Sequence, residues 1–290
     1  MPSIKVEIKA ELVKELREKT SVSMMECKRA LQATNGDVDA AIDLLRKSGE
    51  ATAVKKQGRI AAEGLVVTSS DAAGSQVAIL EINCETDFVA KNNKLLDFAK
   101  EVAGVILATK ILDMDKLGLQ KLANGHTIEQ SRLTLVTQLG ENIVLRRAES
   151  YITTNNQVLG VYMHGMPHKI ASVICLQGGD VNLARDIAMH AAAMRPEYVT
   201  IADVPKDRYQ KEEEIFMEQT RLNNSDKPEN ILQKIVAGRI HKFFKEITLL
   251  DQVFVKDPDF TIDKLLAKHN AKVVKMYRLE VGEGIEKRAS

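Results

Sequence analysis

The sequence predicts an α+β protein, and three observations lead to this class. Apolar residues at helical spacing fill the first fifty positions, a strand–turn–strand–loop–helix order then occurs twice, and two long helical patterns follow residue 205. The repeated order is typical of small antiparallel sheets with helices on one face. We therefore expect a helical N-terminal module, a core of two related halves and a helical hairpin.

The charge balance argues against a protein that binds nucleic acids through their phosphates. The 290 residues include 41 Lys plus Arg and 40 Asp plus Glu, which gives a formal net charge of +1. Proteins that depend on phosphate contacts usually have a marked basic excess. Direct nucleic-acid binding is therefore not expected.

The cysteines and the apolar runs predict a cytoplasmic protein. Cys27, Cys84 and Cys175 are odd in number, far apart and without CxxC spacing, so they suggest neither a disulfide framework nor a zinc site. No apolar run approaches the roughly 20 residues that a membrane span needs, and the start of the chain lacks the layout of a signal peptide. No association with a membrane is expected.

Three short helices are predicted in the N-terminal module. The first covers residues 9–19. Ser23, with a Glu three residues later, has the spacing of a capping box and begins the second helix, which Gly36 ends. A third helix follows and stops before Gly49, and residues 50–62 then form a linker or a solvated helix.

Each half of the core is predicted to contain two strands and a helix. These elements cover residues 64–67, 76–82 and 94–106 in the first half and residues 160–163, 169–175 and 183–191 in the second. Helices over residues 112–122 and 127–139 and a strand over residues 142–152 are expected between them. The polar residues 140–142 could be functional, but a strand-entry turn explains them. Arg146 and Arg147 alternate along that strand, so they should not form a basic cluster.

The two halves differ in the loop that joins the second strand to the helix. In the first half, Thr86 and Asp87 are good helix caps, and Phe88 and Val89 follow them directly. An aromatic residue here is either packed under its own helix, which is the more ordinary arrangement, or offered to another protein. The corresponding loop of the second half, residues 177–180, has no aromatic residue. This difference favours an exposed Phe88.

A helical hairpin is predicted beyond residue 205. A highly charged stretch, residues 205–221, leads to a turn at residues 223–228, and apolar residues then recur at helical spacing through residue 247. Two such helices bury one side against each other, so the hairpin should project or pack on a partner such as a second copy of the chain. A helix over residues 261–269 and a strand over residues 272–281 follow.

No motif indicates an active site or a cofactor. The sequence lacks a phosphate-binding loop, a dinucleotide-binding glycine turn and an HExxH pair. His164 and His168 have the spacing of metal ligands on a helix, but they straddle a predicted turn. His190, on a helix rich in Ala and Met, fits a core or interface residue better than a general base. The chain is therefore predicted to be a binding protein and not an enzyme, with no cofactor or metal.

Seven stretches of the chain match the motifs of one protein family in the correct order. Four of them read TSVSMMECKRAL, ETDFVAK, GENIVLRR and VGEGIEK, and the seven lie at residues 20–31, 35–45, 58–65, 85–91, 140–147, 187–197 and 281–287. Through these motifs the chain resembles the bacterial translation elongation factor Ts family, whose members exchange nucleotide on the GTPase elongation factor Tu.

The resemblance implies a fold and its division into segments. It implies an N-terminal module similar to ubiquitin-associated domains and a coiled-coil hairpin inserted into the second half of the core. The expected segments are residues 1–54 for the module, 55–140 for the first half, 141–200 with 249–282 for the second half, 201–248 for the hairpin and 283–290 for a short tail.

The resemblance also implies a function and the residues that carry it. The protein would bind elongation factor Tu with GDP and promote GDP release, so that GTP can bind. The family motif credited with displacing Mg²⁺ from the GTPase corresponds to Thr86, Asp87, Phe88 and Val89. Contacts with the GTPase are implied for Val22, Met24, Met25, His190, Pro196 and Glu197.

One alternative of another class stays open. The protein could be an RNA- or ribosome-associated scaffold without exchange activity, which would use Lys55, Lys56, Arg59 and the charged hairpin. Salt dependence separates the two functions, because binding to phosphates weakens steeply with added salt. Self-association through the hairpin is a further expectation.

Overall fold

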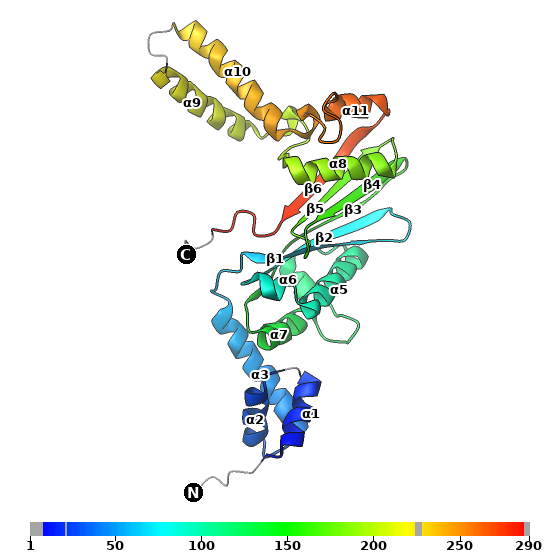
Figure 1. Ribbon diagram of the computed structural model, residues 1–290, viewed down its shortest axis with the longest axis vertical. Helices are drawn as coiled ribbons and strands as arrows, with labels where there is room; N and C mark the ends of the chain where they lie inside the picture. Colours follow the sequence, from blue (N-terminus) through cyan, green and yellow to red (C-terminus); the bar gives the residue numbers. More distant parts are fainter. Residues whose placement is uncertain (1–7, 21, 224–227, 287–290) are drawn as a thin grey trace.

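The computed structural model describes residues 8–20, 22–223 and 228–286, and its elements lie along one long axis (Figure 1). A bundle of helices forms one end, a helical hairpin forms the other, and the sheets lie between them. Helices and antiparallel sheets occur in separate stretches of the chain, which confirms the predicted α+β class.

The N-terminal bundle forms around a small apolar core. It comprises α1 (Ala10–Thr20), α2 (Met24–Ala33) and α3 (Val38–Lys56), and its buried side chains are Val13, Leu16, Val22, Cys27, Ala30, Leu31, Ala41 and Leu45. Half of the predicted capping box is present. The Ser23 hydroxyl accepts the backbone N–H of Glu26 at 3.3 Å, but the Glu26 carboxylate accepts the Ser23 hydroxyl proton instead of the backbone N–H. Gly36, at φ +87°, ends α2 as predicted.

The helix α3 is longer than predicted, because Gly49 does not end it. A Cβ atom at Gly49 would lie only 2.6 Å from Oγ1 of Thr137 on α7 (Ile128–Leu139). The glycine therefore lets α3 and α7 approach closely, and this contact joins the bundle to the core. The prediction was wrong because a glycine that ends a helix and a glycine that lets two helices pack look the same in a sequence.

Two antiparallel sheets of three strands each form the centre of the described residues. The first sheet has the order β1 (Glu63–Ser70), β2 (Gln76–Cys84), β3 (Ile143–Ile152), and the second has the order β4 (Gln157–His164), β5 (Ile170–Gln177), β6 (Lys272–Glu280). Each predicted strand pair is present. The strand β3 pairs with β2 and so belongs to the first sheet. If the core is divided by its sheets, the first half therefore ends at Ile152, whereas the predicted boundary lies between residues 140 and 141.

The two sheets pack face to face. The middle strand β2 is buried on both faces, because helices cover one face of the sheet and the second sheet covers the other. Leu80 and Ile82 lie in the core beneath the helices, whereas Val77 and Ile79 face the second sheet. The core between the sheets consists of Val66, Val77, Ile79, Leu159, Ala171, Val173, Cys175 and Leu279.

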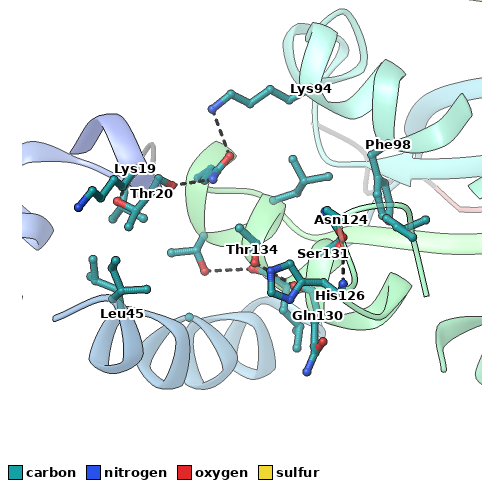
Figure 2. Close-up of a pocket in the computed structure, with 18 of the residues that line it drawn as sticks. Lys19, Thr20, Leu45, Lys94, Phe98, Asn124, His126, Gln130, Ser131 and Thr134 are labelled. Atoms are coloured by element: carbon teal, nitrogen blue, oxygen red, sulfur yellow. Dashed lines mark hydrogen bonds between the residues drawn. The ribbon is translucent and has the colours of Figure 1, made fainter. Parts of the chain in front are cut away.

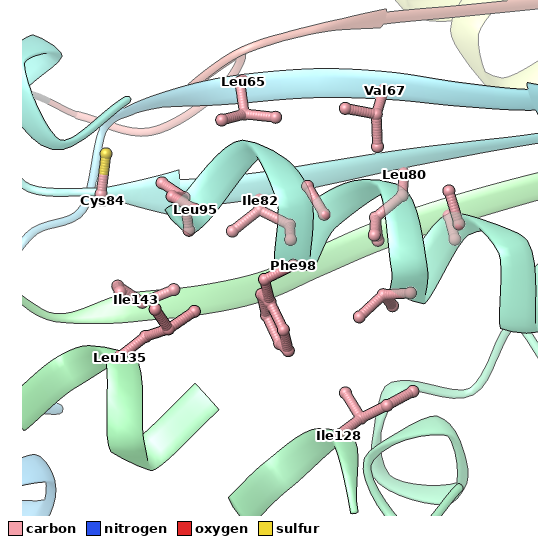
Figure 3. Packing of buried hydrophobic residues seen from close by; sticks show 14 of the residues in the cluster. Leu65, Val67, Leu80, Ile82, Cys84, Leu95, Phe98, Ile128, Leu135 and Ile143 are labelled. Atoms are coloured by element: carbon pink, nitrogen blue, oxygen red, sulfur yellow. The ribbon is translucent and has the colours of Figure 1, made fainter. Parts of the chain in front are cut away.

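Helices cover the outer face of each sheet. The first sheet is covered by α5 (Asn93–Thr109), α6 (Met114–Gly118) and α7, and the second by α8 (Val181–Met194) and α11 (Ile262–Lys268). Figure 3 shows Leu80 and Ile82 of β2 facing Leu95 and Phe98 of α5, with Ile128 of α7 below them. This packing fixes the position of the loop between β2 and α5.

The helix α6 is shorter than the predicted helix over residues 112–122. Asp113 caps its start by accepting the N–H of Lys116 at 2.9 Å. The helix ends at Gly118, after which the chain doubles back and Lys121 forms an antiparallel bridge with Thr127. The bridge replaces the last predicted turn of helix.

The hairpin consists of α9 (Lys206–Asn223) and α10 (Glu229–Ile247), flanked by the short 3-10 helices η1 (Ile201–Asp203) and η2 (Leu249–Asp251). The apolar stripe of α10 packs on α9. Phe244 stacks on Tyr209 with ring centroids 4.9 Å apart, and Phe243 meets Phe216 edge to face at 5.7 Å. The hairpin projects from the core (Figure 1), and most of its predicted turn, residues 223–228, lies outside the described residues.

Candidate functional site

The loop after β2 presents an aromatic side chain to the outside. Thr86 caps the one-turn helix α4 (Asp87–Ala90) by accepting the N–H of Val89 at 3.4 Å. Val89 packs into the core of the first half, whereas Phe88 is 81% exposed. The two neighbouring side chains thus have opposite surroundings, and the interpretation that Phe88 packs under its own helix is excluded.

An ionised carboxylate lies beside the exposed ring. The side chain of Asp87 accepts a hydrogen bond from Nζ of Lys91 at 2.6 Å, one helical turn further along the chain. This hydrogen bond holds the pKa of the Asp87 carboxyl below its ordinary value. The surface therefore combines a large apolar group with an acidic group that stays charged at neutral pH.

The loop is held on its inner side by Glu141, which lies two residues before β3. One carboxylate oxygen accepts the backbone N–H groups of Glu85 and Thr86, both at 3.0 Å, and the other accepts the Thr86 hydroxyl proton at 2.5 Å. Glu85 returns the contact, because its carboxylate accepts the N–H of Asn142 at 2.7 Å. The sequence of residues 140–142 indicated a strand-entry turn, so this role of Glu141 was not predicted, although these residues lie in one of the matched motifs.

Cys84 lies beneath the same loop, and its thiol is unreactive. Its thiol donates to the carbonyl oxygen of Thr86 at 3.1 Å. Burial, together with the nearby charge of Glu141, raises the pKa of the Cys84 thiol to about 12. Since the thiolate is the nucleophilic form, this residue is not a candidate for catalysis. Cys27 and Cys175 are likewise free and buried.

The prediction that Arg146 and Arg147 do not cluster was wrong. A bulge interrupts the pairing of β2 with β3, so that Glu81 lies opposite Arg147 while Ile82 lies opposite Leu145. Arg146 is the extra residue of the bulge, and both guanidinium groups reach Glu81, at 2.8 and 2.6 Å. A bulge changes the face on which a side chain points, which strict alternation does not anticipate.

The buried carboxylate of Glu81 fixes the segment after β6. Burial raises the pKa of this carboxyl, but the N–H of Gly282 at 2.8 Å and the two guanidinium groups outweigh burial and hold the pKa below its ordinary value. Arg147 also binds Glu283 at 3.0 Å. The matched motifs at residues 140–147 and 281–287 are therefore joined across one buried charge.

The N-terminal candidates divide into exposed and buried residues. Met24 and Met25, on the first turn of α2, are 49% and 65% exposed. Val22 is buried in the core of the bundle, and Ser21, which precedes it, lies outside the described residues. Of the sequence-predicted contacts in this module, only the two methionines offer their side chains to a partner.

The candidates of the second half are mostly internal. His190 is fully buried on α8; its Nδ1 accepts the N–H of Val255 at 3.2 Å, so its Nε2–H donates to Oε1 of Gln252 at 2.9 Å. Burial lowers the pKa of His190, although the bond to Gln252 opposes this effect. It is a satisfied core histidine. Pro196 is buried too, while Glu197 is exposed and lies 3.7 Å from Arg208.

Two cavities lie next to some of the candidate residues. One, of about 520 Å³, lies between the N-terminal bundle and the core, and Figure 2 shows Thr20 and Leu45 of the bundle on one side and Lys94 and Phe98 of α5 on the other. The second, of about 430 Å³, is lined by residues that include Pro196 and Glu197. Within the described parts of the chain, no group of three or more His, Cys, Asp or Glu side chains is placed to hold a metal ion.

Among the residues that the structure describes, no helix is both long enough and apolar enough to cross a bilayer.

Comparison with known proteins gives one consistent result. A family model described as "Elongation factor TS" matches residues 85–283. Relatives named Elongation factor Ts include those of Ruthia magnifica subsp. Calyptogena magnifica, 48% identical over 97% of this chain and 93% of the relative, and of Thioalkalivibrio sulfidiphilus, 49% identical over 97% and 94%. The relative from Hydrogenovibrio crunogenus is 46% identical over 96% and 93%.

Proposed function

Because the chain belongs to the elongation factor Ts family and is thus a translation elongation factor, we propose that it releases GDP from the GTPase elongation factor Tu. The observation that carries the proposal is the exposed ring of Phe88 on a turn that Glu141 and the packing of Val89 hold in place. Such a ring is available to enter an apolar pocket of a partner. The protein then acts by binding and catalyses no covalent step.

Insertion of Phe88 supplies the free energy for the change in the partner. Burial of a phenylalanine side chain contributes roughly 1.5–3 kcal/mol. A pocket that opens only when the GTPase elements around Mg²⁺ and the phosphates have moved would couple this gain to loss of the metal. Since Mg²⁺ is the largest local positive charge at a nucleotide phosphate site, its loss weakens GDP binding.

The coupling is reciprocal. If the exchange factor weakens GDP binding by a given free energy, bound GDP weakens binding of the exchange factor by the same amount. Couplings of this kind are typically about 1–3 kcal/mol. Incoming GTP can therefore dissociate the complex and complete one round of exchange.

The other candidates receive different parts in this proposal. Met24 and Met25 form a second apolar contact, for which the flexible thioether side chain is well suited. Val22, Val89, His190 and Pro196 are buried, so we assign them to holding the contact surfaces in place. Glu197 is exposed and would contact the partner directly.

The scaffold alternative is weakened by the local contacts of its basic residues. Nζ of Lys56 donates to the carbonyl oxygen of Gly140, and Arg59 lies 3.5 Å from Glu85. Of Lys55, Lys56 and Arg59, two are therefore already engaged within the protein. An exchange factor explains the exposed Phe88, whereas a scaffold that binds phosphates does not.

The test is the release of fluorescent GDP from elongation factor Tu, with the wild type, Phe88→Ala and Leu222→Ala. Leu222 is a matched control, because it is 78% exposed but lies at the far end of the hairpin. We expect Phe88→Ala to lower the acceleration about 30-fold, which corresponds to about 2 kcal/mol, and Leu222→Ala to act as the wild type does. A wild type without effect on GDP release would contradict the proposed function.

A further inference from the structure

We propose that residues 138–142 form a junction that fixes the Phe88 loop relative to the N-terminal bundle, and that Glu141 is its positioning residue. The inference rests on the proposed function, since it explains how the two contact surfaces, Phe88 and the methionines of α2, are held in one arrangement. Glu141 itself would touch neither the GTPase nor the nucleotide.

On one side, the junction holds the loop. The helix α4 has a single turn, which is too short to be stable by itself. The carboxylate of Glu141 accepts three hydrogen bonds from the two residues just before this turn, Glu85 and Thr86. Loss of the carboxylate would leave two backbone N–H groups without an acceptor in a partly buried place, which is unfavourable.

On the other side, the same short segment holds the N-terminal bundle. The side-chain N–H₂ of Gln138 donates to the carbonyl oxygen of Thr20, the last residue of α1, at 2.6 Å. Lys56, at the end of α3, donates to the carbonyl oxygen of Gly140. The side chain of Asn142 donates to the carbonyl oxygen of Arg59, three residues after the end of α3, at 3.0 Å.

This arrangement explains how the exposed ring of Phe88 can enter a pocket of the partner with little loss of conformational freedom. A side chain on a mobile loop loses conformational freedom when it enters a pocket, and that loss reduces the free energy of binding. A loop fixed by three hydrogen bonds to one side chain has lost this freedom before the partner arrives. The fixed bundle adds a second surface at a constant position, so both contacts form in one encounter.

The chain offers a matched pair of variants for Glu141. Glu141→Ala removes all three acceptor contacts. Glu141→Gln keeps the shape: its carbonyl oxygen can accept both backbone N–H groups, and its N–H₂ group can donate to the Thr86 hydroxyl oxygen. The positioning role predicts a defect in the first variant and rescue in the second.

The first readout needs no partner. Cys84 lies beneath the loop, whereas Cys27 lies in the core of the bundle and Cys175 lies between the sheets. Alkylation of each thiol, resolved by mass spectrometry, distinguishes loop opening from unfolding. We expect Glu141→Ala to speed alkylation of Cys84 about tenfold or more, with Cys27 and Cys175 unchanged. Glu141→Gln, which also removes the charge, should stay within about twofold of the wild type.

The second readout is GDP release in a double-mutant cycle. If Glu141 acts by positioning Phe88, Glu141→Ala should lower the acceleration about tenfold in the wild type and less than about twofold in Phe88→Ala. An equal effect in both backgrounds, or alkylation of all three cysteines together, would overturn the proposal. If the wild type fails to release GDP, the proposed function is lost, whereas the alkylation result still decides whether Glu141 holds the loop.

Discussion

In each half of the core, one loop joins the second strand to the helix. The two loops occupy equivalent places but differ in the side chains that they expose. In the first half, residues 85–92 form a capped turn that leaves Phe88 exposed. In the second half, Gly178 and Gly179 take positive φ angles and Asp180 caps α8 by accepting the N–H of Leu183 at 2.8 Å. The first loop presents a side chain, and the second has almost no side chain to present.

The difference follows from what lies next to each loop. A Cβ atom at Gly178 would come within 2.5 Å of the carbonyl oxygen of Asn270, two residues before β6, so the second loop is closed by backbone packing. The first loop instead rests on the carboxylate of Glu141, which leaves its outer side free. Two halves with the same order of elements can thus differ in the role of this loop: one loop packs against the protein's own backbone, and the other is free to contact a partner.

The largest expected effect on stability comes from the second loop. Gly178→Ala should lower the free energy of unfolding by about 2–3 kcal/mol, because it adds both a positive-φ strain and a clash with Asn270. Phe88→Ala should change it by less than about 0.5 kcal/mol. Urea denaturation measures both. Gly74→Ala is a control for strain alone, since its φ is +67° and its surroundings are open. Equal stability of the Gly178 and Gly74 variants would break the comparison.

A smaller effect is expected at the second apolar contact. Met25→Ala removes the more exposed methionine of α2 and should weaken the complex with elongation factor Tu about fivefold, close to 1 kcal/mol. Isothermal titration calorimetry with the nucleotide-free GTPase measures this affinity, with Leu222→Ala as the control. Unchanged affinity would leave Phe88 as the main contact and remove the bundle from the interface.

The smallest effect expected is a dependence of stability on pH in the second half. Burial lowers the pKa of His190 below its ordinary value of 6.5. Below that value the unfolded chain binds a proton that the folded protein does not, so the free energy of unfolding falls as the pH falls. Urea denaturation between about pH 7.5 and 5.5 should show a shallower slope for His190→Gln. An identical slope would mean that His190 titrates alike in both states.

Much of the fold could be predicted from the sequence, because local patterns carried it. Short apolar runs and tight turns marked the strands, and Ser23 and Gly36 marked the ends of α2. The errors lay where a distant contact decides the local structure. Gly49 serves helix packing instead of helix termination, and the bulge at Arg146 depends on how β3 pairs with β2.

The candidate site was only partly visible in the sequence. The lack of an aromatic residue in residues 177–180 correctly favoured an exposed Phe88. The supports of the loop were not visible, because Glu141 lies 55 residues beyond Thr86 in the chain, and nothing local shows that the two meet. Similarly, Glu81 shows no sign in the sequence that it binds Gly282 across the sheets.

We propose that Phe88 accelerates GDP release by disturbing the Mg²⁺ site of the partner. The most direct test compares the wild type with Phe88→Ala in GDP release from elongation factor Tu, once with Mg²⁺ and once with excess EDTA. We expect a difference of about 30-fold with Mg²⁺ and less than about twofold without it, since the metal is then already absent. The same difference under both conditions would contradict this mechanism and would assign Phe88 to binding alone.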